Sequence, residues 1–409
     1  MQFSPLAGTL RFDICVVGAG FTGLGTALEL VKRGFKVAVL EAGLIGEGAS
    51  GASGGQIASG YNTGMIEAAE IAGEEGVQDL WDLSERSKKI LFDRIRHHKI
   101  QCDLGRGEIY AAVKPSHYQW LQDEKKLCEE RFGFEGYELI PQEEMQRYIG
   151  SSRYVGALLD HEGGHIHPLN YSLGMADAAI SAGAHIFAQS KALSYRHETG
   201  KVVIETEAGE IIADSLILAG NAYINNIAPP LLKRMIPVKS SILATEVLPD
   251  TLRKEIWSTN ACVCDTNFDL DYYKMSADGR LIYGGQDFSL LRPNPPWKII
   301  QRNMLRTFPQ LEETAIDFFW SGKIAVTRTL LPDVGQLDKN VFYAHGYSGQ
   351  GVTLSAGVSE ILADAVVGQM TRLDIFSKLP RTRVPKSKLL QVPAVYAAAY
   401  WKRIIDLIN

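Results

Sequence analysis

The sequence predicts an α/β protein with two domains. The chain has 409 residues, enough for two domains, and its apolar and charged fractions of 46% and 22% are typical of a globular protein. A strand, a glycine turn and a helix follow one another at residues 13–34, and the same order returns at 340–368. Strand and helix patterns alternate over much of the chain between them, as α/β architecture requires.

The first unit carries the pattern of a nucleotide-binding loop. Residues 13–17 form an apolar run that predicts a buried strand. Gly18, Gly20 and Gly23 then occupy the three glycine places of G-x-G-x-x-G. These glycines allow a tight turn, a close approach of the backbone to a pyrophosphate, and packing of the next helix, whose N-terminus favours phosphate.

The unit closes with a helix and a second strand. The helix over 24–33 ends at Gly34, which suits the left-handed conformation that often follows a helix. The apolar run 35–42 predicts a buried strand with Glu41 near its end. A carboxylate there can accept hydrogen bonds from ribose hydroxyls and would repel a 2′-phosphate, so NADP is disfavoured.

The other elements follow from apolar periodicity and turn residues. Helices are expected at 77–98, 117–133, the first part of 167–187, the last part of 340–368, and 393–408. Strands are expected at 106–113, 238–248 and 270–284, at the end of 167–187, and within 201–223, where a hairpin runs into a strand ending at Gly220.

Three features favour FAD over NAD as the nucleotide. The Gly-, Ala- and Ser-rich segment at 46–56 lets backbone lie flat against a planar ring system. The strand and glycine turn at 215–223 return the chain to the nucleotide. The glycine turn at 345–351 precedes a helix whose N-terminal dipole suits the negative charge of a reduced flavin. The alternative is a strand–turn–helix unit that binds no ligand.

The motifs VVGAGFTGL, VLEA, GASGASGGQ, AGNAY and GYSGQGV together resemble the FAD-dependent amine and amino-acid oxidases, the superfamily of D-amino-acid, glycine and sarcosine oxidases. Residues 152–171, 270–285 and 345–353 resemble a subgroup that oxidises gamma-glutamylated polyamines. The resemblance covers nearly the whole chain. It implies an α/β, Rossmann-type, glutathione-reductase-like FAD-binding domain at 10–60, 160–235 and 325–375. It also implies an α+β substrate domain with a β-sheet over the flavin at 61–159 and 236–324, and a tail with a helix at 376–409.

The resemblance also implies which residues bind FAD. They are Gly18, Gly20, Phe21, Thr22, Gly23, Glu41, Ala42, Ser50, Gly51, Gly54, Gly55, Gln56, Ala192, Ala219, Gly220, Gly346, Gly349, Gln350, Gly351 and Val352. Some relatives attach flavin through Cys or His, but 48–56 and 320–328 contain neither, so non-covalent FAD is expected. Some relatives also use a lysine beside the flavin to activate oxygen. Ile282 holds the matching place, which leaves O2 and another electron acceptor both open.

Amine oxidation of this type moves a hydride from the carbon beside the nitrogen, and the amine must be neutral when it reacts. An aromatic pocket would lower the amine pKa by desolvation. Candidate pocket residues are Tyr61, Tyr272, Tyr273, Trp320 and Tyr347; core packing is the alternative for each. Candidate catalytic residues are His345 as a proton carrier, Tyr272, Tyr273 and Lys274, and candidate partners of a substrate carboxylate are Lys274, Lys323 and Arg328.

Composition limits the partners and the compartment. A net charge of −5 argues against broad binding to nucleic acid or anionic membranes, and no apolar run is long enough to span a bilayer. The N-terminus lacks a signal-peptide pattern, and five cysteines, an odd number, suit reduced thiols in a cytoplasmic protein. His161, His165 and His167 suggest a metal site, but His165 and His167 lack a clear carboxylate partner, so structural roles are favoured for the three. The sequence does not predict an oligomeric state.

Three functions remain after these observations. The first is oxidative deamination of gamma-glutamylputrescine or a related primary amine to an imine that hydrolyses to aldehyde and ammonia, with H2O2 formed from O2. The second is oxidation of a secondary amine or imino acid of the sarcosine, glycine or pipecolate type. The third, from another class, is a nucleotide-binding sensor without turnover.

Overall fold

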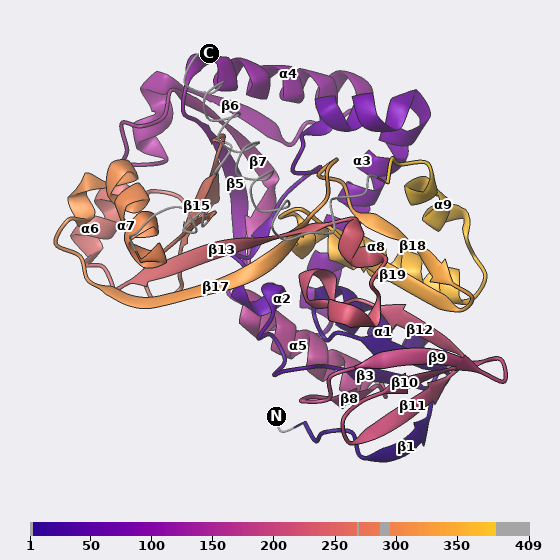
Figure 1. Ribbon diagram of the computed structural model, residues 1–409. Coiled ribbons are helices and arrows are strands. Elements are labelled where there is room, and N and C mark those ends of the chain that lie inside the picture. The colour runs from indigo at the N-terminus through magenta and orange to yellow at the C-terminus, as the bar shows by residue number, and fades with distance from the viewer. Residues whose placement is uncertain (1–2, 268–269, 287–294, 382–409) are drawn as a thin grey trace.

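The computed structural model describes residues 3–267, 270–286 and 295–381. These residues form three β-sheets with helices packed on them (Figure 1). The predicted helix at 393–408 lies outside the described residues. The mixed α/β class predicted from the sequence is confirmed.

The first sheet has the strand order β18-β19-β12-β2-β3-β8. Strands β19, β12, β2, β3 and β8 pair in parallel, and β18 pairs antiparallel with β19 at the edge. The bounds are β2 Ile14–Val17, β3 Val37–Leu40, β8 His185–Phe187, β12 Ser215–Leu218, β18 Asp333–Asp338 and β19 Val341–His345.

Two different layers cover this sheet. Val16 and Val39 pack in a core with helices α1 (Phe21–Lys32), α5 (Pro168–Ser181) and α8 (Gly351–Val366). Cys15 and Ala38, whose side chains point to the other face, pack against a four-stranded sheet. That sheet has the order β1-β11-β10-β9, with bounds Gly8–Arg11, Gly209–Ala213, Lys201–Glu205 and Ser194–Glu198. The apolar runs of β2 and β3 are therefore buried on both faces, as in other parallel sheets.

The third sheet has the order β17-β13-β16-β15-β14-β5-β7-β4, and β6 also pairs with β7. Its pairs are antiparallel except β14 with β5. Figure 1 shows β13 and β17 as a long ribbon that crosses the molecule. The bounds are β4 Gln56–Ile57, β5 Gly105–Ala112, β6 Tyr137–Pro141, β7 Gly156–His165, β13 Ile236–Thr245, β14 Cys262–Asp265, β15 Asp271–Met275, β16 Leu281–Gln286 and β17 Ile316–Val326.

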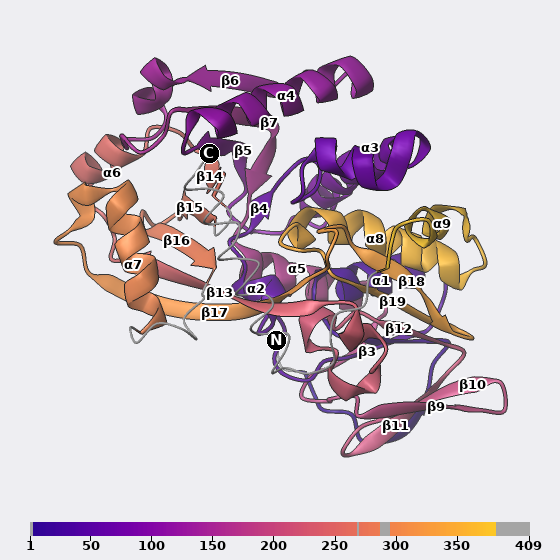
Figure 2. The ribbon, with the colours of Figure 1, turned by 45° about the horizontal axis from the view of Figure 1, so that its top comes forward.

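Helices pack on both faces of the third sheet. Helices α3 (Met65–His97) and α4 (Pro115–Phe132) share a core with β6 and β7, and Figure 2 shows them at the opposite end of the molecule from β9–β11. Helix α7 (Pro296–Thr307) covers the other face near α6 (Asp250–Ile256). Shorter helices are α2 (Ala49–Ala52), α9 (Thr371–Ser377), and the 3-10 turns η1 Gln142–Arg147, η2 Asn221–Tyr223, η3 Asn225–Ile227, η4 Leu231–Lys233 and η6 Pro309–Leu311.

Most predicted elements correspond to observed ones. The strands predicted at 106–113 and 238–248 are β5 and β13, and 270–284 divides into β15 and β16. The helix predicted at 77–98 is the later part of α3, which begins at Met65 and is interrupted by the non-helical Gly73. The sequence reasoning missed β7, β14, β17 and α7.

The strand assignments also bear on the domain division, which stays a prediction. Residues predicted for the FAD-binding domain contribute β2, β3, β8, β12, β18 and β19 to the six-stranded sheet. Two boundaries differ from the sheets. The boundary at residue 160 falls inside β7, and β4, which lies before residue 61, belongs to the third sheet.

Candidate functional site

A cavity of about 460 Å³ lies where the parallel strands of the six-stranded sheet end. Val17 and Leu40 end β2 and β3, Ala219 follows β12, and all three lie in the cavity wall. Ligands of open parallel sheets bind at this edge. The wall also contains the small-residue segment after β3 and the turn before α8, so separate parts of the chain meet here.

Most residues predicted to bind the cofactor line this cavity. They are Gly18, Gly20, Phe21, Thr22, Glu41, Ala42, Ser50, Ala192, Ala219, Gly220, Gly349, Gly351 and Val352. The other predicted residues lie outside the wall: Gly23, Gly51, Gly54, Gly55, Gln56, Gly346 and Gln350. The cavity also has lining residues that the sequence did not single out, among them Lys191 and Asn221, each next to a predicted one.

Two helix N-termini point into the cavity from different parts of the chain. Helix α1 begins after Gly20 and helix α8 after Gln350, and neither N-cap side chain caps its helix. First-turn residues of both helices lie in the cavity wall. The hydroxyls of Thr22 and Tyr347 form a 2.7 Å hydrogen bond that ties the two helix starts together. Partial positive charge therefore converges on one place, as an anionic ligand requires.

Gly18 shows why the loop needs glycine. Its φ of +102° is strained for any residue with a side chain, and an added Cβ would lie 2.9 Å from the carbonyl oxygen of Ala219. The neighbouring carboxylate of Glu41 accepts hydrogen bonds from the backbone N–H of Ala19, at 2.8 Å, and of Gly43, at 3.0 Å. Glu41 is thus fixed at the end of β3, facing the cavity with the acceptor oxygens that a ribose needs.

These features fit FAD. The cavity joins a glycine loop, the α1 N-terminus for phosphate, the α8 N-terminus for the negative charge of a reduced flavin, a fixed carboxylate for ribose, and small residues between Gly46 and Ser53 beside which a flat ring can pack. FAD would be held by the residues of α1 and the Glu41 region at its nucleotide end and by the 347–352 turn at the other.

The third sheet presents a mixed aromatic and polar face next to this cavity. The Tyr272 ring of β15 lies over two glycines, since a Cβ added at Gly54 or Gly284 would come within 2.9 Å and 2.4 Å of ring carbons. The Tyr272 hydroxyl is 2.7 Å from the Ser240 hydroxyl of β13. Trp320 of β17 donates its indole N–H to the carbonyl of Ala52 at 3.1 Å. Two of the predicted aromatic residues therefore contact or adjoin the small-residue segment that borders the cavity.

Lys274 is a buried cation behind the same segment. Its ammonium donates a hydrogen bond to the carbonyl oxygen of Ile166 and lies 3.1 Å from the position of a Cβ added at Gly55. Burial lowers the pKa of Lys274 to about 8. In the sheet register, Lys274 stands directly opposite Ile282, the position discussed for oxygen activation. Lys274 is not in the cavity wall.

Three predicted site residues have side chains that are engaged outside the cavity wall, and their roles stay predictions. Tyr273 lies on the opposite sheet face from Tyr272, stacked on Tyr283 with its hydroxyl on Tyr154, so it is a core residue. Tyr61 is buried and donates its hydroxyl to the carbonyl of Leu80.

The third of these residues, His345, does not line the cavity. It is 1% exposed, with Nε2 2.9 Å from an oxygen of Asp333 and Nδ1 3.3 Å from the sulfur of Met235. Both ring nitrogens are thus engaged within the core. A proton-carrying role at the cavity is not supported by this placement.

The remaining candidates lie at the margin. Tyr347 is in the cavity wall, with its hydroxyl bonded to Thr22 rather than free. Lys323 and Arg328 are exposed residues of β17 and of the segment that follows it, outside the wall. Lys323 donates its backbone N–H to the hydroxyl of Tyr223, which does line the cavity, so its side chain starts close to that edge.

The three histidines considered for a metal have separate protein partners. The His161 ring lies 2.6 Å from Glu138, and the His165 ring lies 2.9 Å from the carbonyl of Asn260. The His167 ring accepts the backbone N–H of Asn170 at the start of α5. Within the ranges that the structure describes, no group of three or more His, Cys, Asp or Glu side chains is arranged to hold a metal ion.

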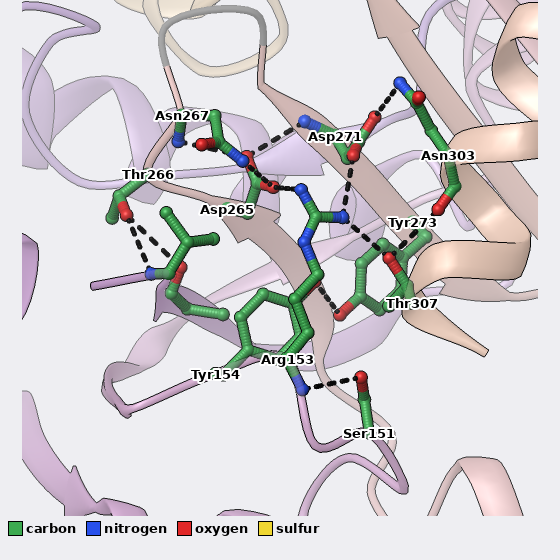
Figure 3. Close-up of polar contacts among 12 residues, drawn as sticks. Ser151, Arg153, Tyr154, Asp265, Thr266, Asn267, Asp271, Tyr273, Asn303 and Thr307 are labelled. Atoms are coloured by element: carbon green, nitrogen blue, oxygen red, sulfur yellow. Dashed lines mark hydrogen bonds and ion pairs between the residues drawn. The ribbon is translucent and has the colours of Figure 1, made fainter. Parts of the chain in front are cut away.

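A charge cluster with buried carboxylates, which we call the Arg153 cluster, joins the middle strands of the third sheet to α7 (Figure 3). The Arg153 guanidinium contacts Asp265 and Asp271, each at 2.9 Å, and the Thr307 hydroxyl at 2.7 Å. Asn303 donates to Asp271 at 3.0 Å. Burial and the neighbouring Asp271 raise the pKa of Asp265. The cluster ties β14 and β15 to α7, and no local sequence motif predicted it.

The fold and cavity together define a dinucleotide-binding enzyme fold with a second sheet beside the nucleotide site. Comparison with known proteins gives the family. Residues 13–365 match the DAO family model, described as FAD dependent oxidoreductase. The chain is 37% identical, over 402 residues, to gamma-glutamylputrescine oxidoreductase of Escherichia coli K12, covering 98% of this chain and 94% of that protein.

Solved structures agree at the level of the fold. Glycine oxidase from Geobacillus kaustophilus has a TM-score of 0.74 at 21% identity, covering 91% of this chain and 99% of that one. L-proline dehydrogenase from P. horikoshii has a TM-score of 0.74 at 20% identity, covering 90% and 96%. The chain belongs to the DAO family of FAD-dependent oxidoreductases. The predicted family and cofactor are confirmed, and the enzyme interpretation prevails over the sensor.

In 3–267, 270–286 and 295–381, no single helix has both the length and the apolar composition to cross a bilayer. Helices α8 and α9 reach that length and composition only as a pair, which is bent by 114° at the junction.

Proposed function

We propose that the protein oxidises the terminal primary amine of gamma-glutamylputrescine or a close gamma-glutamylated analogue. The supporting observation is the near full-length similarity to the Escherichia coli gamma-glutamylputrescine oxidoreductase. Bound FAD supplies the hydride acceptor for the carbon–hydrogen bond beside the nitrogen. The resulting imine would hydrolyse to aldehyde and ammonia, with reoxidation by O2 giving H2O2.

The face formed by Tyr272, Ser240 and Trp320 is the part of the chain that suits the amine. A free primary amine has a pKa of about 10, like lysine, and is protonated at neutral pH. Aromatic walls exclude water and so favour the neutral amine, which is the reactive form. Tyr272 itself stays a neutral phenol, because burial raises its pKa further above the usual value.

The glutamyl carboxylate requires a cation at a distance from the reacting carbon. Lys323 and Arg328 are the candidates that suit it best, since both are exposed near the end of β17. Lys274 is the weaker candidate because its ammonium is buried and bonded to Ile166. We propose instead that the Lys274 ammonium places a positive charge beside Gly55.

Anaerobic mixing with a panel of amines tests the proposal. Gamma-glutamylputrescine should bleach the flavin absorbance, and it should be oxidised about tenfold to a hundredfold better than putrescine, because one charge-assisted contact contributes about 1.5–3 kcal/mol. Putrescine carries a second cation where the carboxylate should be. Lys323→Gln or Arg328→Gln should shrink the preference without lowering flavin content. Equal kcat/KM for the two amines would remove the gamma-glutamyl assignment.

The second candidate is oxidation of a secondary amine or imino acid. Its support is the similarity of the fold to glycine oxidase and L-proline dehydrogenase. Sarcosine, glycine, pipecolate and proline belong in the same panel. Rapid bleaching by one of them, with no response to gamma-glutamylputrescine, would favour this alternative.

A further inference from the structure

The hydroxyl pair on the third sheet has a defined direction. The Ser240 hydroxyl lies 2.7 Å from the Tyr272 hydroxyl and 3.2 Å from the carbonyl oxygen of Gly285. A carbonyl oxygen can only accept, and a serine hydroxyl has one proton to donate. If Ser240 donates to Gly285, the bond between the two hydroxyls must run from Tyr272 to Ser240. The Tyr272 proton is then committed to the sheet.

The Tyr272 oxygen consequently offers lone pairs to a ligand and no proton. The ring is partly exposed and lies over Gly54 and Gly284, on the side of the sheet that borders the small-residue segment. The backbone of β13, β15 and β16 holds the pair, since Ser240 is registered with Gln286 and Tyr272 with Gly284. Rotation of the Ser240 hydroxyl away from this order would leave the Gly285 carbonyl without the Ser240 bond, and rotation of the Tyr272 hydroxyl would break the bond between the two hydroxyls.

This direction matters for a neutral amine. Its nitrogen has two N–H donors and one lone pair, and the lone pair must form the carbon–nitrogen double bond as the hydride leaves the neighbouring carbon. An acceptor at Tyr272 would bind one N–H and leave the lone pair available. A donor at Tyr272 would bind the lone pair itself and oppose the reaction.

We infer that Ser240 is a positioning residue that makes the Tyr272 oxygen a hydrogen-bond acceptor for the substrate amine. The inference rests on the proposed function for its substrate class. In the step, the carbon–hydrogen bond breaks with its electron pair going to FAD as hydride, the nitrogen lone pair forms C=N, and the product is the iminium ion. Ser240 touches neither substrate nor cofactor and acts through Tyr272.

Substitutions of Ser240 and Tyr272 are expected to change the rate of flavin reduction in opposite directions. Ser240→Ala frees the Tyr272 proton for the amine lone pair, so anaerobic flavin reduction at saturating amine should slow by about tenfold, the effect of one misdirected hydrogen bond. Ser240→Thr keeps the hydroxyl and should retain the rate. Adding Tyr272→Phe to Ser240→Ala removes the misdirected donor and should restore part of the rate. Ser321→Ala, at an exposed serine of β17, is the matched control.

A second measurement separates positioning from structural damage. The dissociation constant of a non-oxidisable amine, with two methyl groups on the carbon that bears the nitrogen, is measured by calorimetry. It should stay the same or fall in Ser240→Ala and rise in Tyr272→Phe. Weaker binding in both, together with a double variant as slow as Ser240→Ala, would mean that Ser240 only supports the ring and would overturn the inference.

A third measurement needs no amine and so distinguishes failure of the inference from failure of the proposed function. Ultraviolet resonance Raman difference spectra between the unmodified protein and Tyr272→Phe isolate the tyrosine doublet of Tyr272, whose intensity ratio reports donor or acceptor status. A donor signal that is lost in Ser240→Ala supports the hydroxyl order. An acceptor signal in the unmodified protein overturns it, whichever amine is oxidised.

Discussion

The cofactor cavity and the Tyr272 face use the chain in different ways. The cavity is built largely from backbone: glycine turns, helix N-termini and small side chains, with Glu41 as its fixed carboxylate. The Tyr272 face is built from side chains on neighbouring strands, held in register by the sheet and by the Arg153 cluster, which includes the adjacent Asp271. The cavity depends on local conformation, and the Tyr272 face depends on the alignment of distant segments.

This difference predicts which property of the protein a substitution in each region will change. A substitution in the cavity should change cofactor content while the rest of the molecule stays folded. A substitution in the supports of the third sheet should change stability or turnover while the cofactor stays bound. Four variants test that separation.

Gly18→Ala should have the largest effect. The new methyl group would lie 2.9 Å from the Ala219 oxygen at a φ of +102°, so the loop must move and the cavity with it. Purified protein should contain little flavin, measured as flavin released into acid per polypeptide. Gly34→Ala is the matched control, because its φ is +89° but no atom lies within 4 Å of the added Cβ. It should cost about 1 kcal/mol of stability and keep its flavin.

The acid step in this measurement also tests attachment. Non-covalent FAD should leave the precipitated chain in full. Yellow colour that stays with the precipitate would contradict the non-covalent attachment. Full flavin content in Gly18→Ala would contradict the role of Gly18 in the cavity.

Arg153→Met should act in the opposite way, on stability rather than on flavin. It leaves Asp265 and Asp271 buried without their cation, which should lower the free energy of unfolding by about 3–5 kcal/mol. Urea unfolding of the holoprotein measures this change. Arg147→Met, at an exposed side chain, should change stability by no more than about 0.5 kcal/mol. Loss of flavin from folded Arg153→Met would break the proposed separation.

Glu41→Arg should weaken FAD binding by at least about tenfold, since it removes the fixed acceptor together with its hydrogen bonds from Ala19 in the glycine loop and from Gly43 after β3. Equilibrium dialysis of the apoprotein with FAD measures it. Glu47→Gln is the control in the same wall, where the carboxylate bonds only the local Leu44 N–H among the described residues. An unchanged dissociation constant in Glu41→Arg would argue against the ribose assignment.

Glu108→Gln should have the smallest effect, a change in the pH dependence of stability. Burial and the neighbouring Asp160 raise the pKa of Glu108 to about 8. The folded protein therefore holds this proton more tightly than the unfolded chain does, and the contribution to stability is lost as pH rises from the ordinary glutamate range through about 8. Tm of the variant should exceed that of the unmodified protein at pH 8.5 but not at pH 4.5. Parallel Tm curves would contradict the assignment.

The sequence predicted the cavity better than the third sheet, for a physical reason. Gly18, Gly20 and Glu41 lie within one short strand–helix–strand unit, where spacing along the chain determines spacing in space. Ser240 and Tyr272 are brought together by strand register, which depends on packing over the whole sheet. Neither the Arg153 cluster nor the burial of His345 leaves a local pattern. Strand β17 was missed because its exposed apolar residues do not alternate with polar ones.

The bond between Thr22 and Tyr347 has a consequence for how the protein is made. The residues of the cavity wall extend along the chain from Val17 to Ser355. The N-terminal glycine loop therefore forms only part of the binding site until α8 has been synthesised. A nascent chain cannot enclose FAD, and a chain truncated before α8 should be left with an open nucleotide edge. Cofactor loading thereby depends on synthesis through α8, and free FAD stabilises by mass action only chains that have reached that helix.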